Sequence, residues 1–253
     1  MVTFSVQSGS NGNCIYVETD DARLLFDAGV SGKQLEQRMA EHNRSPRDVD
    51  ALLISHEHSD HVRCAGIFHR KFDLPIYMTR PTHYAVQCDL GKTDQVRHFI
   101  AGHTLEFGVT KVHTFSTPHD AVDGVVFVVE HDGTRLAILT DLGYAFKKLD
   151  GLLDSVDAAY LESNYDVDML QMGEYPAFLK ARIRGKGGHL SNCEAAGVLR
   201  RVASKRHQWI ALSHLSGQNN TPDIALETHH RTVGKSFPFD VSSREGVSCM
   251  RTV

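Results

Sequence analysis

A short apolar run, Leu52–Ile54, leads directly into a segment in which three imidazoles and two carboxylates lie within six residues. The run is typical of a strand, and the side chains at its end indicate a metal site. Imidazole and carboxylate ligands suit zinc, and also manganese or iron, while the lack of closely spaced cysteines argues against a structural zinc finger. Residues two apart in an extended segment point the same way, so His56 and His58 can bind one ion, and Asp60 and His61, past a bend, can face a second. The alternative is a solvated polar loop.

Three further candidate ligands, His119, Asp141 and His214, each follow a predicted strand. Functional side chains collect on such loops because a rigid scaffold holds the loop ends. Each alone would be a weak indication, but together with the histidine-rich segment they supply ligands for two divalent metal ions, Zn or Mn, with Fe as a further candidate. We expect Asp141 to bridge the two ions. The remaining ligands form two sets, one of His56, His58 and His119 and the other of Asp60, His61 and His214.

Length and composition indicate one globular domain covering residues 1–253, because 41% of the residues are apolar and no composition break marks a linker. No apolar stretch is long enough for a membrane span, and the N-terminus lacks the features of a secretory signal. The five cysteines are odd in number and have no framework spacing, which fits reduced thiols. We therefore expect a cytoplasmic protein without a membrane partner. The sequence does not indicate an oligomeric state.

Predicted strands dominate residues 3–54 and 96–139, whereas helices alternate with strands from residue 146 onward. Two β-rich halves, each accompanied by helices, predict an α+β fold with four layers, αβ/βα, in which loops from both halves meet at one rim. Among the later strands, one is expected at Ala158–Leu161 and the last at Val247–Met250. Cys14 and Cys249 are expected to be small buried residues in strands.

The formal net charge of −4 gives no general attraction for nucleic acid. The segment from Lys180 to Arg206 differs, because it contains many basic residues and one acidic residue, Glu194. Its basic residues are Lys180, Arg182, Arg184, Lys186, Arg200, Arg201, Lys205 and Arg206. This segment is either a phosphate-facing surface or a solvated helix face, and its position in three dimensions decides between them.

The order of these motifs resembles the metallo-β-lactamase fold family across nearly the whole chain. Within it, Ser8–Asn13, His119-Asp120-Ala121, Gly188–Asn192 and the region from His214 to Pro222 are similar to the YycJ/WalJ subfamily, a relative of the RNase Z, RNase J and PhnP phosphodiesterases. The resemblance implies a dinuclear metal-dependent phosphodiesterase, a nuclease of the 5′ to 3′ exonuclease type, with DNA favoured over RNA as substrate. The alternative is a thioester or lactone hydrolase of the glyoxalase II type. A non-catalytic binding module is disfavoured because every expected ligand position is filled.

The resemblance also implies roles for residues beside the ligands. His189 would protonate the leaving oxygen of a phosphodiester, which needs a proton or a metal to depart. Its alternatives are packing against the following helix or binding a metal. Asp60 would orient the attacking water in addition to binding metal, and Asp27 and Asp120 are expected to orient ligand imidazoles.

Substrate contacts are expected in two loops. Asn219, Asn220 and Thr221 lead into a predicted helix, whose N-terminus could receive a phosphate. Helix capping is the alternative for Thr221. Ser10 and Asn11 would face the same anion, unless their loop is a plain hairpin turn.

Overall fold

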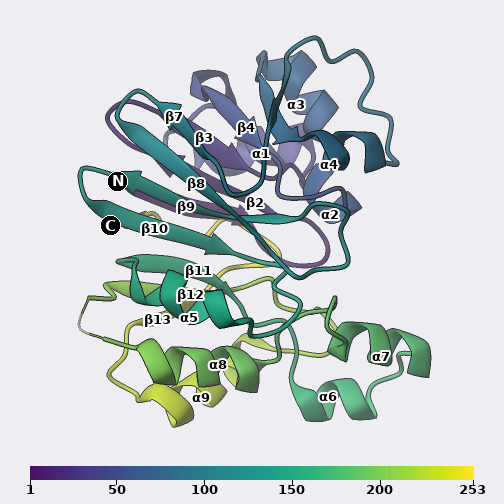
Figure 1. Ribbon diagram of the computed structural model, residues 1–253, viewed down its shortest axis with the longest axis vertical. Helices are drawn as coiled ribbons and strands as arrows, with labels where there is room; N and C mark the ends of the chain where they lie inside the picture. The colour runs from purple at the N-terminus through teal and green to yellow at the C-terminus, as the bar shows by residue number, and fades with distance from the viewer. Residues whose placement is uncertain (205) are drawn as a thin grey trace.

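The computed structural model describes residues 1–204 and 206–253. Within these residues the strands form two seven-stranded sheets that pack face to face (Figure 1). The first sheet contains, in spatial order, β14 (Arg251–Thr252), β1 (Val2–Gln7), β2 (Cys14–Glu18), β3 (Arg23–Phe26), β4 (Ala51–Leu53), β5 (Ile76–Thr79) and β6 (Val96–Phe99). The second contains β13 (Phe239–Val241), β12 (Trp209–Ser213), β11 (Ala158–Glu162), β10 (Thr134–Leu139), β9 (Val125–His131), β8 (Thr110–Ser116) and β7 (Thr104–Phe107).

Both sheets combine an antiparallel half with a parallel half. In the first sheet, neighbouring strands from β14 to β3 are antiparallel and those from β3 to β6 are parallel. In the second sheet, neighbours from β7 to β10 are antiparallel and those from β10 to β13 are parallel. The two halves of the chain therefore share one strand pattern, although the sequence shows no internal repeat. Parallel strands bring their carboxyl ends to one edge of a sheet, where ligand-binding loops commonly lie.

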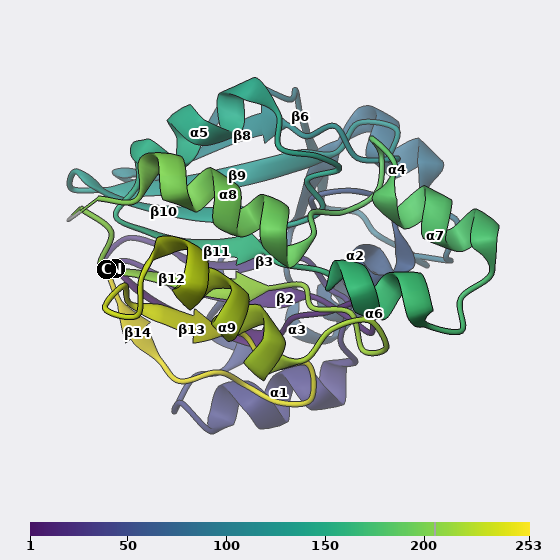
Figure 2. The same ribbon diagram turned by 90° about the horizontal axis from the view of Figure 1, so that it is seen from below.

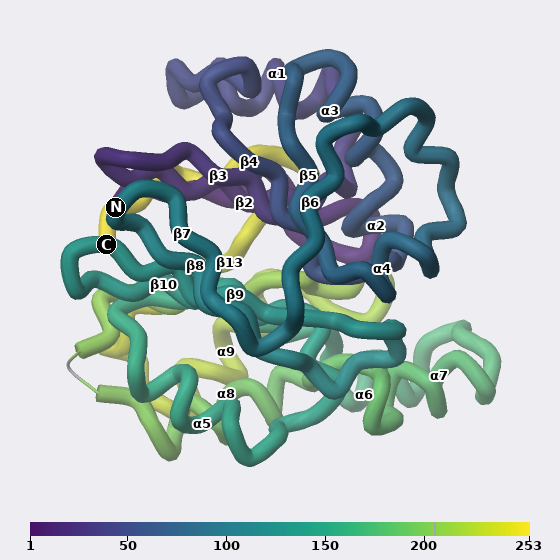
Figure 3. Tube along the Cα trace, turned by 45° about the horizontal axis from the view of Figure 1, so that its top comes forward, coloured from purple at the N-terminus to yellow at the C-terminus, as the bar shows by residue number. Residues whose placement is uncertain are grey.

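Helices cover the outer face of each sheet (Figures 1 and 2). The first sheet is covered by α1 (Gly32–Ala40) and α3 (Ala65–Phe72), and the second by α5 (Lys147–Asp154), α8 (Asn192–Val202) and α9 (Pro222–Val233). A short 3-10 turn, η1 (Pro46–Asp48), precedes β4. The remaining helices lie at the end of the sandwich opposite the termini (Figure 3) and are α2 (Ser59–Val62), α4 (Arg80–Ala85), α6 (Val167–Met172) and α7 (Ala177–Arg184). None of the helices in the described part of the chain is long and apolar enough to cross a membrane.

Three apolar clusters fill the three interfaces between layers. Leu35 of α1 packs with Leu52 of β4 in the first helix–sheet interface. Phe26 and Phe127 meet between the sheets, with ring centroids 5.1 Å apart, and Leu199 of α8 belongs to the second helix–sheet interface. Burial of each sheet on both faces produces the predicted α+β, four-layer αβ/βα arrangement, which is confirmed.

The C-terminal segment differs from its prediction. Residues 247–250 form no strand, and β14 begins at Arg251. The Ser248 N–H donates to the Ser5 carbonyl at 2.8 Å, but the Ser5 N–H donates to the Ser248 hydroxyl at 2.8 Å instead of to a backbone carbonyl, so no regular ladder forms there. Cys249 is consequently exposed, whereas Cys14 is buried in β2 as predicted.

Candidate metal centre

The histidine-rich segment joins β4 to α2. His56 is buried shortly after β4, His58 occupies the N-cap position of α2 without a side-chain capping bond, and Asp60 and His61 lie within the helix. The chain therefore bends after His58, where the sequence indicated a bend. The rings of His56 and His61 are 4.1 Å apart between centroids, so residues from both sides of the bend meet.

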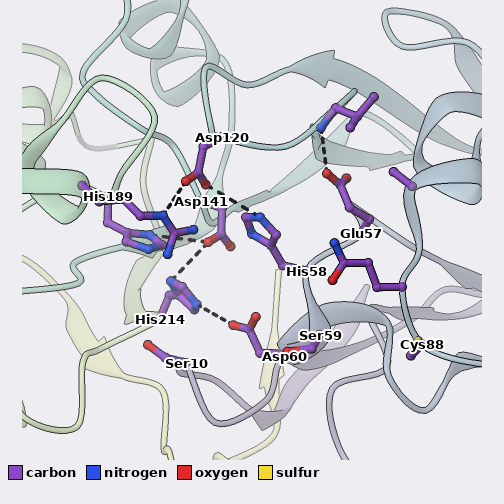
Figure 4. A pocket seen from close by; sticks show the side chains of 14 residues that line it. Ser10, Glu57, His58, Ser59, Asp60, Cys88, Asp120, Asp141, His189 and His214 are labelled. Carbon is purple, nitrogen blue, oxygen red and sulfur yellow. Dashed lines mark hydrogen bonds and ion pairs between the residues drawn. The ribbon is translucent and has the colours of Figure 1, made fainter. Parts of the chain in front are cut away.

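The other three predicted ligands lie on loops after strands of the second sheet, with His119 after β8, Asp141 after β10 and His214 after β12. Asp141 lies among the histidines (Figure 4), with Oδ2 3.1 Å from His61 Nε2 and Oδ1 3.5 Å from His119 Nε2. Asp141 Oδ1 also lies 3.6 Å from His214 Nδ1. Asp141 and His214 both have a φ of 57°, a left-handed conformation that is uncommon outside glycine and concentrates at functional sites. The fold thus brings the predicted ligands of both sheets together.

In the buried imidazoles of this cluster, one nitrogen is occupied by an outer partner. The pairs are His56 Nδ1 with Ser55 Oγ (2.9 Å), His61 Nδ1 with Asp27 Oδ2 (2.7 Å), His119 Nδ1 with the Gly188 carbonyl oxygen (2.9 Å) and His214 Nδ1 with Glu162 Oε1 (3.2 Å). A ring that donates from Nδ1 has a free lone pair on Nε2, which is the form that a metal-binding histidine requires.

His58 has the opposite orientation. Its Nδ1 lies 3.1 Å from His119 Nε2, and its Nε2 lies 3.7 Å from Asp120 Oδ1. Asp27 thus bonds directly to the outer nitrogen of His61, as expected for a group that orients an imidazole. Asp120 Oδ1 is less closely placed, because it lies 3.7 Å from His58 Nε2 and 3.4 Å from His119 Nε2.

The inner atoms of the cluster fit a cation. Among the described residues, buried His56 Nε2 has no hydrogen-bond partner. Asp141 Oδ2 also has no hydrogen-bond partner among the described residues, because it lies near His61 Nε2 without hydrogen-bond geometry. Buried polar atoms are normally paired, so two unpaired ligand atoms in one cluster indicate a missing partner. Among the described residues, four groups have ligand atoms within 4.8 Å of one another: His56, His61 and Asp141; His56, His58 and His119; Asp60, His61 and His214; and Asp141, Glu162, His189 and His214.

Electrostatics favour positive charge at the same place. Burial would lower the pKa of His214, but attraction to Asp141 and hydrogen bonds to Asp60 and Glu162 raise it to about 10. Burial would likewise raise the pKa of Asp141, but His214 and His61 hold it well below its usual range. Carboxylates that favour protonation of buried imidazoles would equally attract a divalent cation in place of those protons.

Glu162, the last residue of β11, is a site residue that the sequence analysis missed. Its Oε1 accepts from His189 Nδ1 at 2.8 Å and from His214 Nδ1 at 3.2 Å. Its Oε2 accepts from the backbone N–H groups of Leu142 at 2.9 Å and Leu190 at 3.1 Å. Burial would raise the pKa of Glu162, but attraction to His189 and the imidazole hydrogen bonds lower it to about 2. The available signal was a carboxylate at the end of an apolar strand, one residue beyond the predicted end.

Four of the candidate ligands, His58, Asp60, Asp141 and His214, line an open cleft of about 580 Å³. His58, Asp60, His189 and His214 point into it from both sheets (Figure 4). Its wall includes Arg182, whose Nε donates to Asp120 Oδ2 at 2.6 Å. The cleft can therefore present several ligand atoms, a carboxylate-held imidazole and a cationic side chain to one bound group.

The five predicted substrate contacts are placed differently. Ser10 lines the cleft, whereas Asn11 donates to the Arg244 carbonyl at 3.1 Å. Asn219 and Asn220 are buried, and the Asn220 amide donates to the carbonyls of Ser163 and Asn164. Thr221 caps α9 by accepting from the Ile224 N–H at 3.2 Å. The side chains of Asn220 and Thr221 thus serve the scaffold, and no direct phosphate contact is assigned to them.

The basic segment is divided between two places. Lys180, Arg182 and Arg184 lie on α7 and Lys186 follows it, whereas Arg200 and Arg201 lie on α8 and Lys205 lies outside the described residues. Arg201 pairs with Asp150 and Arg206 with Asp157. Among the described residues of this segment, Arg182 and His189 line the cleft. The segment is therefore not one continuous basic surface, and its α7 part lies at the cleft.

Comparison with known proteins gives concordant results. Residues 8–178 match the metallo-beta-lactamase superfamily. The chain is 39% identical to exodeoxyribonuclease YycJ of Bacillus anthracis, over 92% of this chain and 92% of that protein. It is 40% identical to exodeoxyribonuclease WalJ of Streptococcus pneumoniae, over 87% of this chain and 84% of that protein.

Solved structures share the fold. The metallo-beta-lactamase fold protein YhfI from Bacillus subtilis superposes with a TM-score of 0.74 at 16% identity, covering 98% of both chains. Zn(2+)-bound PqqB from Methylobacterium extorquens gives a TM-score of 0.74 at 17% identity and covers 100% of both chains. At these identities the likeness concerns the fold alone.

Proposed function

Because this chain belongs to the metallo-β-lactamase superfamily, we propose that it is a metal-dependent exodeoxyribonuclease that hydrolyses phosphodiester bonds in the cleft. The observation that carries this proposal is the placement of His189, whose Nδ1 is held at 2.8 Å by buried Glu162 beside the candidate metal ligands. A phosphodiester's leaving oxygen needs a proton donor at such a position, whereas a thiolate leaving group does not. The printed names of two relatives, exodeoxyribonucleases YycJ and WalJ, support the same substrate class.

The residues of the cluster fit two divalent ions, zinc or manganese, with iron as a third candidate. We assign Asp141 as the bridging ligand, because its two oxygens approach histidines of both sets. One ion would be held by His56, His58 and His119, and the other by Asp60, His61 and His214. Divalent ions held there would supply positive charge that stabilises phosphate oxygens and makes water a stronger nucleophile at neutral pH.

His189 acts in this proposal as the proton donor. Its Nδ1–H remains bonded to Glu162, so the proton on Nε2 is the one available to the leaving oxygen. The Glu162 carboxylate stabilises the imidazolium and fixes the plane of the ring. Asp60 Oδ2 lies 3.4 Å from both His61 Nε2 and His214 Nε2, and its place in the cleft wall would allow it to orient the attacking water.

We propose DNA as the polymer, attack from a 5′ end, and a cytoplasmic setting. Support for DNA and for exonuclease action comes from the names of the relatives. The five cysteines are unpaired in the described part of the chain, which fits a reducing compartment.

The test is digestion of end-labelled single-stranded DNA, duplex DNA and RNA, with and without added manganese. We expect metal-dependent, stepwise shortening of DNA. Hydrolysis of S-lactoylglutathione in preference to bis(p-nitrophenyl) phosphate would instead favour the thioester hydrolase. Cleavage of RNA but not DNA would contradict the assignment of the polymer.

A further inference from the structure

We propose that α7 is the surface that binds the unpaired strand of the substrate, with Phe178 stacking on a base and Arg182 contacting the backbone where it enters the cleft. This inference rests on the proposed nuclease function. It concerns the α7 part of the basic segment and adds Phe178, which no earlier prediction used.

The position of α7 gives the first argument. Helices α6 and α7 project from the body of the molecule (Figures 1 and 2). None of the residues of α7, all of which are described, is buried, and Phe178 is 76% exposed. Phe178 and Arg182 are four residues apart and so occupy one face of the helix, about 6 Å apart along its axis. Since Arg182 lines the cleft, Phe178 continues the same wall outward.

Charge gives the second argument. Residues 177–186 contain four basic side chains and no acidic one. Arg184 and Lys186 are exposed and form no ion pair with any described residue. Lys180 Nζ donates to the Gln171 and Gly173 carbonyls, which ties α7 to the end of α6. An exposed aromatic ring among basic side chains is the combination by which proteins hold single strands without reading their sequence.

The depth of the site indicates an unpaired strand. Candidate ligands Asp141 and His214 are at most 2% exposed and line the cleft. A cleft of about 580 Å³ admits individual nucleotides, whereas paired bases are held inside a duplex. Stacking on Phe178 likewise requires a base whose face is free. The substrate class is therefore DNA with a single-stranded end.

A rigid connection links α7 to His189. The chain leaves α7 at Arg184, and the His189 N–H donates to the Ile183 carbonyl at 3.0 Å, while the Gly188 N–H donates to Gly185 at 2.9 Å. A Cβ at Gly188 would lie 2.0 Å from the Ile183 carbonyl oxygen, so the tight turn requires glycine. A strand bound along α7 is thus held in a fixed position relative to the proposed proton donor.

The test measures binding as well as turnover. Equilibrium binding of a fluorescent single-stranded oligonucleotide of about 12 nucleotides is measured by anisotropy in EDTA for wild type, Phe178→Ala and Phe178→Trp. Stacking energies predict a Kd about tenfold higher for Phe178→Ala and near wild type for Phe178→Trp. Val109→Ala is the matched control, because Val109 is 62% exposed at the turn between β7 and β8, beside Asp21. It should not change the Kd.

The effect of Phe178→Ala on turnover should depend on the length of the strand. In Phe178→Ala, the ratio of kcat/KM for the oligonucleotide to kcat/KM for bis(p-nitrophenyl) phosphate should fall about tenfold, and the ratio for a dinucleotide should fall far less. A wild-type Kd for Phe178→Ala would overturn the proposal. A change in molar mass by light scattering without a change in Kd would also overturn it and make α7 a self-association surface. Wild-type protein that binds the strand but hydrolyses no DNA would count against the proposed function instead.

Discussion

The replacement Glu162→Gln tests how the site fixes the position of the proton on His189. The Glu162 carboxylate accepts four hydrogen bonds, two from His189 and His214 on Oε1 and two from backbone N–H groups on Oε2. A glutamine can accept on one side only, so its NH₂ group must face either the two imidazoles or the two N–H groups. Each buried donor left without an acceptor costs about 1–3 kcal/mol. Because the backbone cannot move away, we expect the NH₂ group to face His189 and to displace the proton from its Nδ1.

The expected loss follows from the role of His189. General acid catalysis contributes about 100- to 10,000-fold, and a misplaced proton should remove about 100-fold or more of kcat on DNA. The assay compares DNA with bis(p-nitrophenyl) phosphate at saturating manganese, because p-nitrophenolate departs without a proton. Glu162→Gln should therefore lose far more activity on DNA than on the activated diester, where any remaining loss reports the changed hydrogen bond to His214. Equal losses on both substrates, or no loss on DNA, would refute the role given to Glu162 and His189.

Three other outcomes are expected. His189→Ala should lose DNA hydrolysis about 100-fold or more while keeping its metal content by atomic emission; loss of metal would make His189 a ligand. Asp60→Ala combined with His61→Ala should retain one ion per chain instead of two, and unchanged content would exclude these residues as ligands. Burial lowers the pKa of His229 to about 4 in the native protein, whereas a histidine in the unfolded chain has a pKa of about 6.5. Between these two values the unfolded chain binds a proton that the native protein excludes, so the free energy of unfolding falls as the pH drops from about 6.5 to 4. His229→Leu should remove up to about 3 kcal/mol of that fall, as measured by urea unfolding at neutral and acid pH, and a parallel pH dependence in both proteins would contradict this.

The predicted metal ligands could be found from sequence because each follows a strand whose apolar pattern is clear. His119, Asp141 and His214 lie after β8, β10 and β12, and these strands run in one direction and end at one edge of the sheet. Glu162 also ends an apolar strand, but this signal alone is weak, because a single carboxylate 27 residues from His189 has no spacing pattern that links the two. Its importance arises only when β11 is placed beside the loop that carries His189.

Tertiary placement also decided what polar and basic residues do. Asn220 precedes a helix, as a phosphate-binding residue would, but its amide is used by backbone carbonyls and by Asn192. Arg182 and Arg201 lie in one basic stretch of sequence, yet one lines the cleft and the other pairs with Asp150 on the outer helices. The local sequence pattern predicts neither the role of Asn220 nor the different surroundings of Arg182 and Arg201, because both depend on which elements pack together.

The central claim is that hydrolysis of DNA depends on ions held by the histidine and aspartate cluster. It is tested most directly by stripping the protein of metal, adding manganese or zinc in measured equivalents, and following product release from 5′-labelled single-stranded DNA. We expect no hydrolysis without metal and a rate that saturates when two equivalents per chain are bound. Hydrolysis by metal-free protein, or none at any metal content, would contradict it.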